Sequence, residues 1–230
     1  MNSAVAQVAL VLKSWLLLFT LCASSAFSAG LTTKHDDPFL HRLYLGGSAG
    51  YGSTTWQGLV PSAEKQNIAI SMSTPISTSE GGGVFGAFMG YEFTHYFALE
   101  ANYMHFPNAT LLFDETSLFA FDHNDETTML TRTEMISFIA KIMLIIPQTN
   151  HIRAYSNFGI ADIHRDDDLK DHWQVAPTFG FGLTYNITPR IMTELAANYA
   201  AGYGESEINP VDDYIPFLYS ISVKLAYRMF

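Results

Sequence analysis

The stretch SISVKLAYRMF, residues 220–230, decides the fold, because bulky apolar residues alternate along it with small or polar ones. Together with the residues just before it, one face carries Phe217, Tyr219, Ile221, Val223, Leu225 and Tyr227. The other face carries Ser220, Ser222, Ala226 and, at its middle, Lys224. A period of two predicts a β-strand with one strongly apolar face.

The same alternation recurs along the chain. Eight segments show it, at approximately 42–53, 83–93, 96–106, 133–146, 152–162, 173–185, 190–202 and 216–230. Their connections alternate between tight turns (THY, PQTN and ITP) and long or polar stretches at 54–82, 107–132, 163–172 and 203–215. Strands of this length with short turns at one end and long loops at the other are typical of outer-membrane barrels. The sequence therefore predicts an all-β protein, an eight-stranded antiparallel up-and-down transmembrane β-barrel with four long extracellular loops.

The two faces of segment 173–185 indicate which side meets lipid. Phe179, Phe181 and Leu183 share one face, and Gly180 and Gly182 lie on the other. The interior of an eight-stranded barrel is just wide enough to be filled by side chains, so small residues suit the inside and bulky ones the outside. A soluble lipocalin-like barrel, the alternative, would place its apolar residues within.

The N-terminus predicts secretion. Lys13 precedes the apolar run WLLLFTLC and the small-residue stretch ASSAFSAG, which indicates a signal peptide over residues 1–28, cleaved after Ala26 or Ser28. An uncleaved membrane anchor is the alternative, but the run falls short of the roughly 20 apolar residues that a spanning helix needs. We expect residues 29–41 to be a short periplasmic segment and residues 42–230 to form the barrel. The one cysteine, Cys22, lies in the apolar run, so the mature chain has no disulfide framework.

Four charged residues fall on the inner faces of the predicted strands. They are Glu100, Lys141, Glu194 and Lys224. Each lies about six positions from a short turn or from the chain end, or about 15 Å above the rim, near the bilayer midplane. Charges there are tolerated only inside and paired, and we expect Glu100 to pair with Lys141 and Glu194 with Lys224. This lumen charge layer predicts a polar plug; a gated ion or proton path is the alternative.

Two more charged residues, Glu92 and Arg153, have the same inward parity but lie nearer the short turns.

The sequence gives little support for nucleic acid, a cofactor or a metal ion as a ligand. A net charge of −10 argues against nucleic acid as a partner. No Walker-type or dinucleotide glycine loop occurs, and we expect no cofactor. The run Asp166, Asp167 and Asp168 raises the alternative of a divalent cation site, but it lacks the alternating ligands of an EF-hand loop. We expect no metal site and solvated acidic loops.

The chain end resembles the C-terminal signature of bacterial outer-membrane proteins, in which a final Phe230 with an upstream aromatic is read by the barrel assembly machinery. The chain departs from that pattern because Tyr227 lies three residues from Phe230. With the GYEF hairpin at 90–93 and the inward Glu/Lys layer, the chain resembles the small eight-stranded family of the outer membrane protein A barrel, the opacity proteins and outer membrane protein W. The resemblance implies a monomer in the outer membrane of a Gram-negative bacterium, in contact with lipid and lipopolysaccharide. It also implies a role in envelope integrity or in surface contact with a host or surface ligand at the loops.

Two other functions remain as alternatives. A narrow channel for small apolar molecules, as the resemblance to outer membrane protein W implies, would use the apolar part of loop 107–132 and the inward Met104 and Phe106. A lipid A deacylase or acyltransferase is the second. The deacylase type uses a His-x-Ser pair, and none of the eight histidines is followed two residues on by serine. We therefore expect no enzyme and assign no catalytic residue.

Overall fold

The computed structural model describes residues 43–61, 72–146, 151–202, 211 and 214–229. The signal peptide expected at 1–28, the segment expected at 29–41 and the terminal Phe230 lie outside these residues. In the described part of the chain, no helix is both long enough and apolar enough to cross a bilayer.

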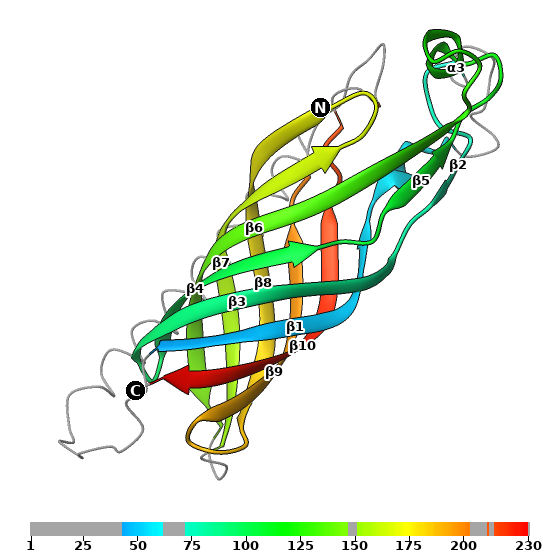
Figure 1. The fold of residues 1–230 in the computed structure, drawn as a ribbon. Coiled ribbons are helices and arrows are strands. Elements are labelled where there is room, and N and C mark those ends of the chain that lie inside the picture. Colours follow the sequence, from blue (N-terminus) through cyan, green and yellow to red (C-terminus); the bar gives the residue numbers. More distant parts are fainter. Residues whose placement is uncertain (1–42, 62–71, 147–150, 203–210, 212–213, 230) are drawn as a thin grey trace, which may run out of the picture. The chain divides into compact units, whose positions relative to one another are not determined.

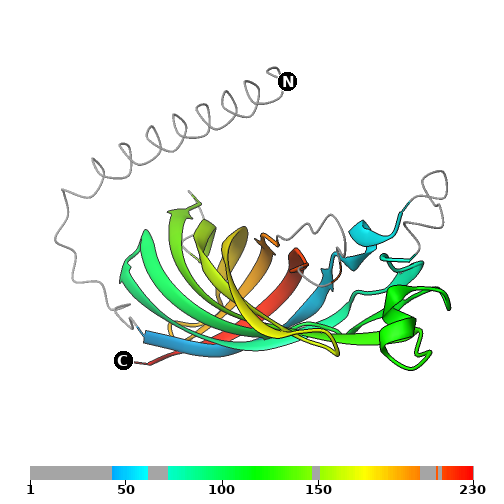
Figure 2. The ribbon, with the colours of Figure 1, turned by 90° about the horizontal axis from the view of Figure 1, so that it is seen from above.

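Eight antiparallel strands close into a barrel (Figures 1 and 2). They are β1 (Leu43–Thr54), β3 (Gly82–Thr94), β4 (Phe97–His105), β6 (Thr128–Ile145), β7 (Ile152–Asp166), β8 (Asp171–Asn186), β9 (Ile191–Ala200) and β10 (Leu218–Met229). Neighbours in the chain are neighbours in the sheet, β10 pairs with β1, and every ladder is antiparallel. Closure leaves the barrel wall without a free edge, as a membrane requires. The predicted fold is confirmed.

Short elements continue the fold beyond one end of the barrel. Strand β2 (Ser77–Ser79) pairs with β5 (Ala109–Leu112), which pairs with the start of β6, and α3 (Leu118–Asp122) follows β5. The 3-10 helix η2 (Trp56–Leu59) follows β1. Figure 1 places α3, β2 and β5 together at the end opposite the chain's C-terminus. The helix begins after Ser117, whose Oγ accepts a hydrogen bond from the Ala120 amide at 3.1 Å.

One predicted loop is largely strand. We expected a long connection at 163–172, but β7 runs to Asp166 and β8 resumes at Asp171, so only residues 167–170 connect them. Strand β6 likewise begins at Thr128, five residues before the predicted start. Both strands extend past the apolar belt, where neighbouring backbone groups still pair although their side chains face water.

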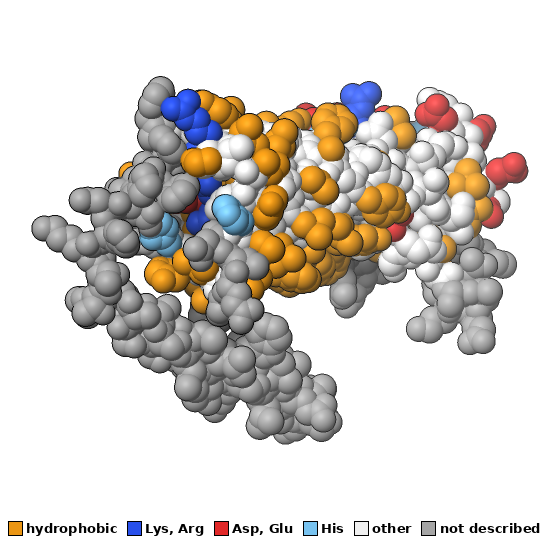
Figure 3. Space-filling view, turned by 90° about the horizontal axis from the view of Figure 1, so that it is seen from below, with side chains coloured by type: hydrophobic (Ala, Val, Ile, Leu, Met, Phe, Trp, Pro, Cys, Tyr) orange, Lys and Arg blue, Asp and Glu red, His pale blue; other side chains and the backbone are white. Residues whose placement is uncertain are grey.

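The barrel wall is apolar outside and small or polar inside. On β8, Phe179, Phe181 and Leu183 are exposed, whereas Thr178 and Thr184 are buried. Hydrophobic side chains cover the middle of the wall, with acidic side chains gathered towards the loop end (Figure 3). Such a belt suits lipid and is the reverse of a lipocalin-like barrel.

Candidate functional site: the charged lumen and the loop cap

The lumen charge layer is built from the inner faces of four strands. Glu100 lies on β4, Lys141 on β6, Glu194 on β9 and Lys224 on β10, and none of the four is more than 3% exposed. These side chains point inward because side chains alternate along a strand, and the neighbours of each of the four residues in the chain point outward to lipid. The layer holds two acids and two bases, so its formal charges balance.

Lys141 and Glu100 are the bridging members of the layer. Lys141 Nζ donates to Glu100 Oε2 and also to Glu194, at 3.1 Å to Oε1 and 2.9 Å to Oε2. Lys224 Nζ donates to the other oxygen of Glu100 at 2.6 Å and to Asn102 Oδ1 at 2.9 Å. The structure thus brings all four predicted residues into one network.

One expected pair does not form directly. Lys224 and Glu194 are opposite one another in the β9–β10 ladder, as the sequence predicts. The Lys224 ammonium nevertheless binds Glu100 on β4, which is separated from β10 by β1 and β3 in the sheet order. In so narrow a barrel a long inward side chain reaches across the lumen, so neighbours along the wall need not be partners.

Two tyrosines that the sequence reasoning missed complete the layer. Tyr44 donates its hydroxyl to Glu100 Oε2 at 2.9 Å, and Tyr155 donates to Glu194 Oε2 at 3.1 Å. The Lys141 ammonium also lies 4.7 Å from the centre of the Tyr155 ring. Inward parity on β1 and β7 was the available signal, since Tyr44 precedes Gly46 and Tyr155 follows Arg153 at steps of two.

Glu92 and Arg153 meet nearer the short turns, with a third partner. Glu92 Oε1 accepts from Arg153 Nη2 at 2.7 Å and from Arg228 Nη2 at 3.1 Å. Tyr227, the residue before Arg228, is exposed on the outer face. We call Glu92, Arg153 and Arg228 the lower tier.

Above the charge layer, apolar side chains pack into the lumen. Met104 and Phe106 are buried there, as expected, together with Val84, Met135, Ala161, Ile163, Ala176, Ala200, Ile215 and Leu218. This apolar cluster separates the charge layer from the loops.

The loop cap, the elements beyond the barrel together with the 167–170 turn and residues 211 and 214–217, is organised around Arg165. Its guanidinium donates to the carbonyls of Val211 at 2.7 Å and Tyr214 at 2.8 Å, and binds Asp167 at 2.5 Å. It also lies 4.8 Å from the centre of the Trp56 ring. Asp167 is therefore buried in an ion pair, not solvated as expected, because its carboxylate is needed to neutralise Arg165. In the described residues no three His, Cys, Asp or Glu side chains gather as a metal site would need.

Two acids of the cap have shifted pKa values. The Trp56 amide donates to Glu80 Oε2 at 2.6 Å, but burial dominates and raises the pKa of the Glu80 carboxyl above its ordinary value. Hydrogen bonds from the hydroxyl and the amide of Thr116 lower the pKa of the exposed Asp114 carboxyl.

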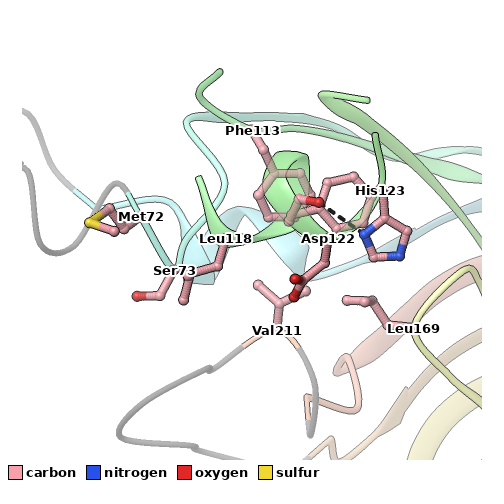
Figure 4. A pocket seen from close by; sticks show the side chains of 9 residues that line it. Met72, Ser73, Phe113, Leu118, Asp122, His123, Leu169 and Val211 are labelled. Atoms are coloured by element: carbon pink, nitrogen blue, oxygen red, sulfur yellow. Dashed lines mark hydrogen bonds between the residues drawn. The ribbon is translucent and has the colours of Figure 1, made fainter. Parts of the chain in front are cut away.

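A small pocket of about 80 Å³ opens beside α3 (Figure 4). Phe119 stacks on Phe113 at 4.4 Å between ring centres and on His123 at 4.3 Å, and His123 Nδ1 donates to the Phe119 carbonyl at 2.9 Å. The lining comprises Met72, Ser73, Phe113, Leu118, Phe119, Asp122, His123, Leu169 and Val211. Next to this pocket, Phe121 projects from α3 and is 83% exposed.

Comparison with known proteins assigns the family. Residues 40–230 match the family model described as the OmpA-like transmembrane domain. No curated protein sequence matches the chain. Among solved structures, Neisserial surface protein A is 12% identical with a TM-score of 0.49, covering 81% of this chain and 97% of its own. OprG from Pseudomonas aeruginosa is 12% identical with a TM-score of 0.49, covering 82% and 97%. Ail from Yersinia pestis is 14% identical with a TM-score of 0.38, covering 80% and 99%. The family match spans the whole barrel, and the chain therefore belongs to the OmpA-like transmembrane domain family and is an integral β-barrel protein of a Gram-negative outer membrane.

Proposed function

We propose that the protein is a barrel with a plugged polar lumen that supports envelope integrity and makes surface contacts through its loops. The observation that carries this proposal is the charge-balanced Glu/Lys layer, whose four side chains bind one another across the lumen and are almost fully buried. An ion crossing it must separate pairs held in a medium of low dielectric constant, which is costly. The apolar cluster above and the lower tier below fill the lumen further.

Conductance tests the plug. Protein refolded into planar bilayers is expected to show little or no steady conductance, with at most small and rare openings. Insertion is verified separately by the slower or faster migration of unboiled protein on gels relative to a boiled sample. Large, stable single-channel openings of inserted protein would overturn the plug and would favour a gated path through the Glu/Lys layer.

A narrow channel for small apolar molecules is the second candidate, favoured by the apolar side chains of the upper lumen. The same side chains serve equally as packing. The candidate predicts faster uptake of a small apolar substrate by cells that carry the barrel, and slower uptake when Met104→Lys or Met135→Lys places a charge in the cluster. Uptake that is unchanged by expression would exclude the channel and leave the plug.

The surface contact site that we propose is α3 with its pocket. Phe121 offers an exposed ring and the pocket offers an apolar recess. Asp122, the last residue of α3, lines the pocket, and the segment before α3 carries Asp114 and Glu115. This combination fits a partner with apolar and cationic groups. The adhesion of cells to amine-modified polystyrene beads tests it, with carboxylate-modified beads as reference. Phe121→Ser should reduce adhesion to the amine beads, while the control Thr128→Ser, at the exposed first residue of β6, should not; equal adhesion by both variants would remove α3 from the proposal.

We further infer a monomer without a catalytic centre, assembled by the barrel assembly machinery and surrounded by lipid and lipopolysaccharide. Support comes from the closed wall, which leaves no strand edge for a second copy, and from the lack of any His-x-Ser pair. Sedimentation of the refolded protein in detergent tests the monomer; a dimer at micromolar concentration would contradict it.

A further inference from the structure

The lower tier is unbalanced in charge, unlike the layer above it. Two guanidinium groups, those of Arg153 and Arg228, converge on one oxygen of Glu92, at 2.7 and 3.1 Å. The tier therefore has two cations for one anion, whereas the Glu/Lys layer has two of each. Among the described residues, one positive charge is therefore left without a counter-ion at this level of the lumen.

The two arginines also have unmet hydrogen-bond donors. Nε of Arg153 and Nε of Arg228 are both buried without an acceptor in the described part of the chain. Their side chains are only 7% and 5% exposed, so bulk water does not readily satisfy these groups. Buried donors are normally paired, and two neighbouring arginines whose Nε–H groups lack acceptors point to an occupant that supplies them.

All three side chains lie close to the short-turn mouth of the barrel. Arg153 is the second residue of β7, Glu92 is two residues from the end of β3, and Arg228 is the last residue but one of β10. Figure 1 shows the end of β10 at the same end of the barrel as the short turns. A solute entering from that mouth meets the lower tier before it meets the Glu/Lys layer.

We propose that Arg153 and Arg228 form a binding site for a small oxyanion, a phosphate or carboxylate group, that enters from the short-turn mouth. The guanidinium fork matches the oxygen spacing of these groups, and the partly neutralising Glu92 holds the two forks side by side. The proposed plug above would make the site a terminus for the anion rather than a stage in its passage, although binding itself does not require the plug. The site does not depend on whether the lumen conducts or on the role of the loops.

The side-chain N–H signals of arginine report directly on this site. The refolded barrel in decyl maltoside, a detergent without phosphate, is labelled with nitrogen-15 and titrated with sodium phosphate, with sodium acetate and, at equal ionic strength, with sodium chloride. We expect saturable shifts of the Arg153 and Arg228 Nε–H signals with the oxyanions and none with chloride. Arg132, an arginine on the outer side with a 62% exposed side chain, is the internal control and should not shift.

The head group of an anionic lipid is the other source of an oxyanion for this site. The protein in nanodiscs of zwitterionic lipid is compared with nanodiscs that contain anionic phospholipid, without free phosphate. Shifts of both Nε–H signals in the anionic discs alone would assign the site to a head-group oxyanion. Shifts that follow chloride equally, or no shift in any of these titrations, would overturn the proposal.

Variants test whether binding needs the planar guanidinium group or only its positive charge. Arg153→Lys and Arg228→Lys keep the charge but lose the planar fork, and each should weaken oxyanion binding by about tenfold or more. Glu92→Gln removes the competing carboxylate and should strengthen binding by about tenfold. Gel mobility of unboiled protein identifies the variants that fold, and if none does, the wild-type titrations still decide. Glu92→Gln that folds and binds oxyanions no more tightly than the wild type would contradict the site.

Discussion

Lys141 is the residue on which the lumen charge layer depends most. Its ammonium binds both glutamates of the layer, whereas Lys224 binds Glu100 and the neutral Asn102. Without Lys141, Glu194 keeps only the hydroxyl of Tyr155 as a hydrogen-bond donor among the described contacts. A buried carboxylate without a counter-ion is much less stable than a buried pair.

We therefore predict that Lys141→Met destabilises the barrel by about 3–5 kcal/mol. The double variant Lys141→Met with Glu194→Gln should cost less than the sum of its two single changes, because both partners of one contact are removed. The matched cycle, Lys224→Met with Glu194→Gln, should show weaker coupling because these side chains do not bind each other directly. Urea unfolding in lipid vesicles, followed by the gel mobility of unboiled protein, measures the free energies of unfolding of the wild type and the five variants. Equal coupling in the two cycles would contradict the partner assignment.

We expect Phe230 to act before folding is complete, so that its loss affects assembly rather than the stability of the folded barrel. The residue lies outside the described part of the chain, and its role as a sorting signal with Tyr227 stays a prediction. Deleting Phe230 should leave unfolded chain in the periplasm, while the fraction that does fold should unfold at nearly the same urea concentration as the wild type. Fractionation of cells measures the first effect and vesicle unfolding the second. Normal outer-membrane levels would mean that Tyr227 and the strand body suffice.

At the scale of elements, the sequence predicts the barrel because lipid and lumen impose opposite demands on alternate residues. That constraint ends at the membrane surface, and beyond it the predicted element boundaries differ from those of the structure. Strands β2 and β5, the helix α3 and the extensions of β7 and β8 have no lipid-facing side, so alternation does not mark them. The candidate site follows the same division: inward parity identifies Glu100, Lys141, Glu194 and Lys224, but which ammonium meets which carboxylate depends on reach across the lumen.

Close approach of two strands explains why one glycine is needed. At Gly159 on β7, a Cβ atom would lie 2.0 Å from the Phe138 carbonyl oxygen of β6. Gly159→Ala should therefore force these strands apart and lower the folded yield by several-fold. Gly83→Ala on β3 is the matched control, because no atom lies within 4 Å of its added Cβ. Gel mobility of unboiled protein after refolding measures the yield, and similar yields for the two variants would contradict the argument.

At the scale of the whole molecule, the barrel and the loop cap are stabilised in different environments, the barrel in lipid and the cap in water. The barrel is held by a closed ladder whose outer face lies in lipid, where exposing backbone groups is strongly unfavourable. The loop cap is held in water by short ladders and by the contacts of Arg165 with Asp167, Val211, Tyr214 and Trp56. The cap also has an apolar cluster of its own around Trp56, but it lacks a closed ladder, and we expect it to open as a separate unit before the barrel unfolds.

Tryptophan positions allow this to be measured. Trp56 is fully buried in the cap, and Trp173 lies on the outer wall of β8. In a chain that starts at residue 29 and carries Trp173→Phe, fluorescence reports Trp56 alone, while gel mobility reports the barrel. We predict that urea exposes Trp56 at a concentration at which the barrel still migrates as folded protein.

Arg165→Gln leaves Asp167 without its counter-ion and two carbonyls without their donor. It should therefore lower the stability of the cap by about 2–4 kcal/mol and move the Trp56 transition to still lower urea. The gel transition of Arg165→Gln should not move, because the described contacts of Arg165 lie in the cap and none of them is with the lumen charge layer. Coincident transitions for the two probes, shifted together by Arg165→Gln, would instead mean that cap and barrel unfold as one cooperative unit.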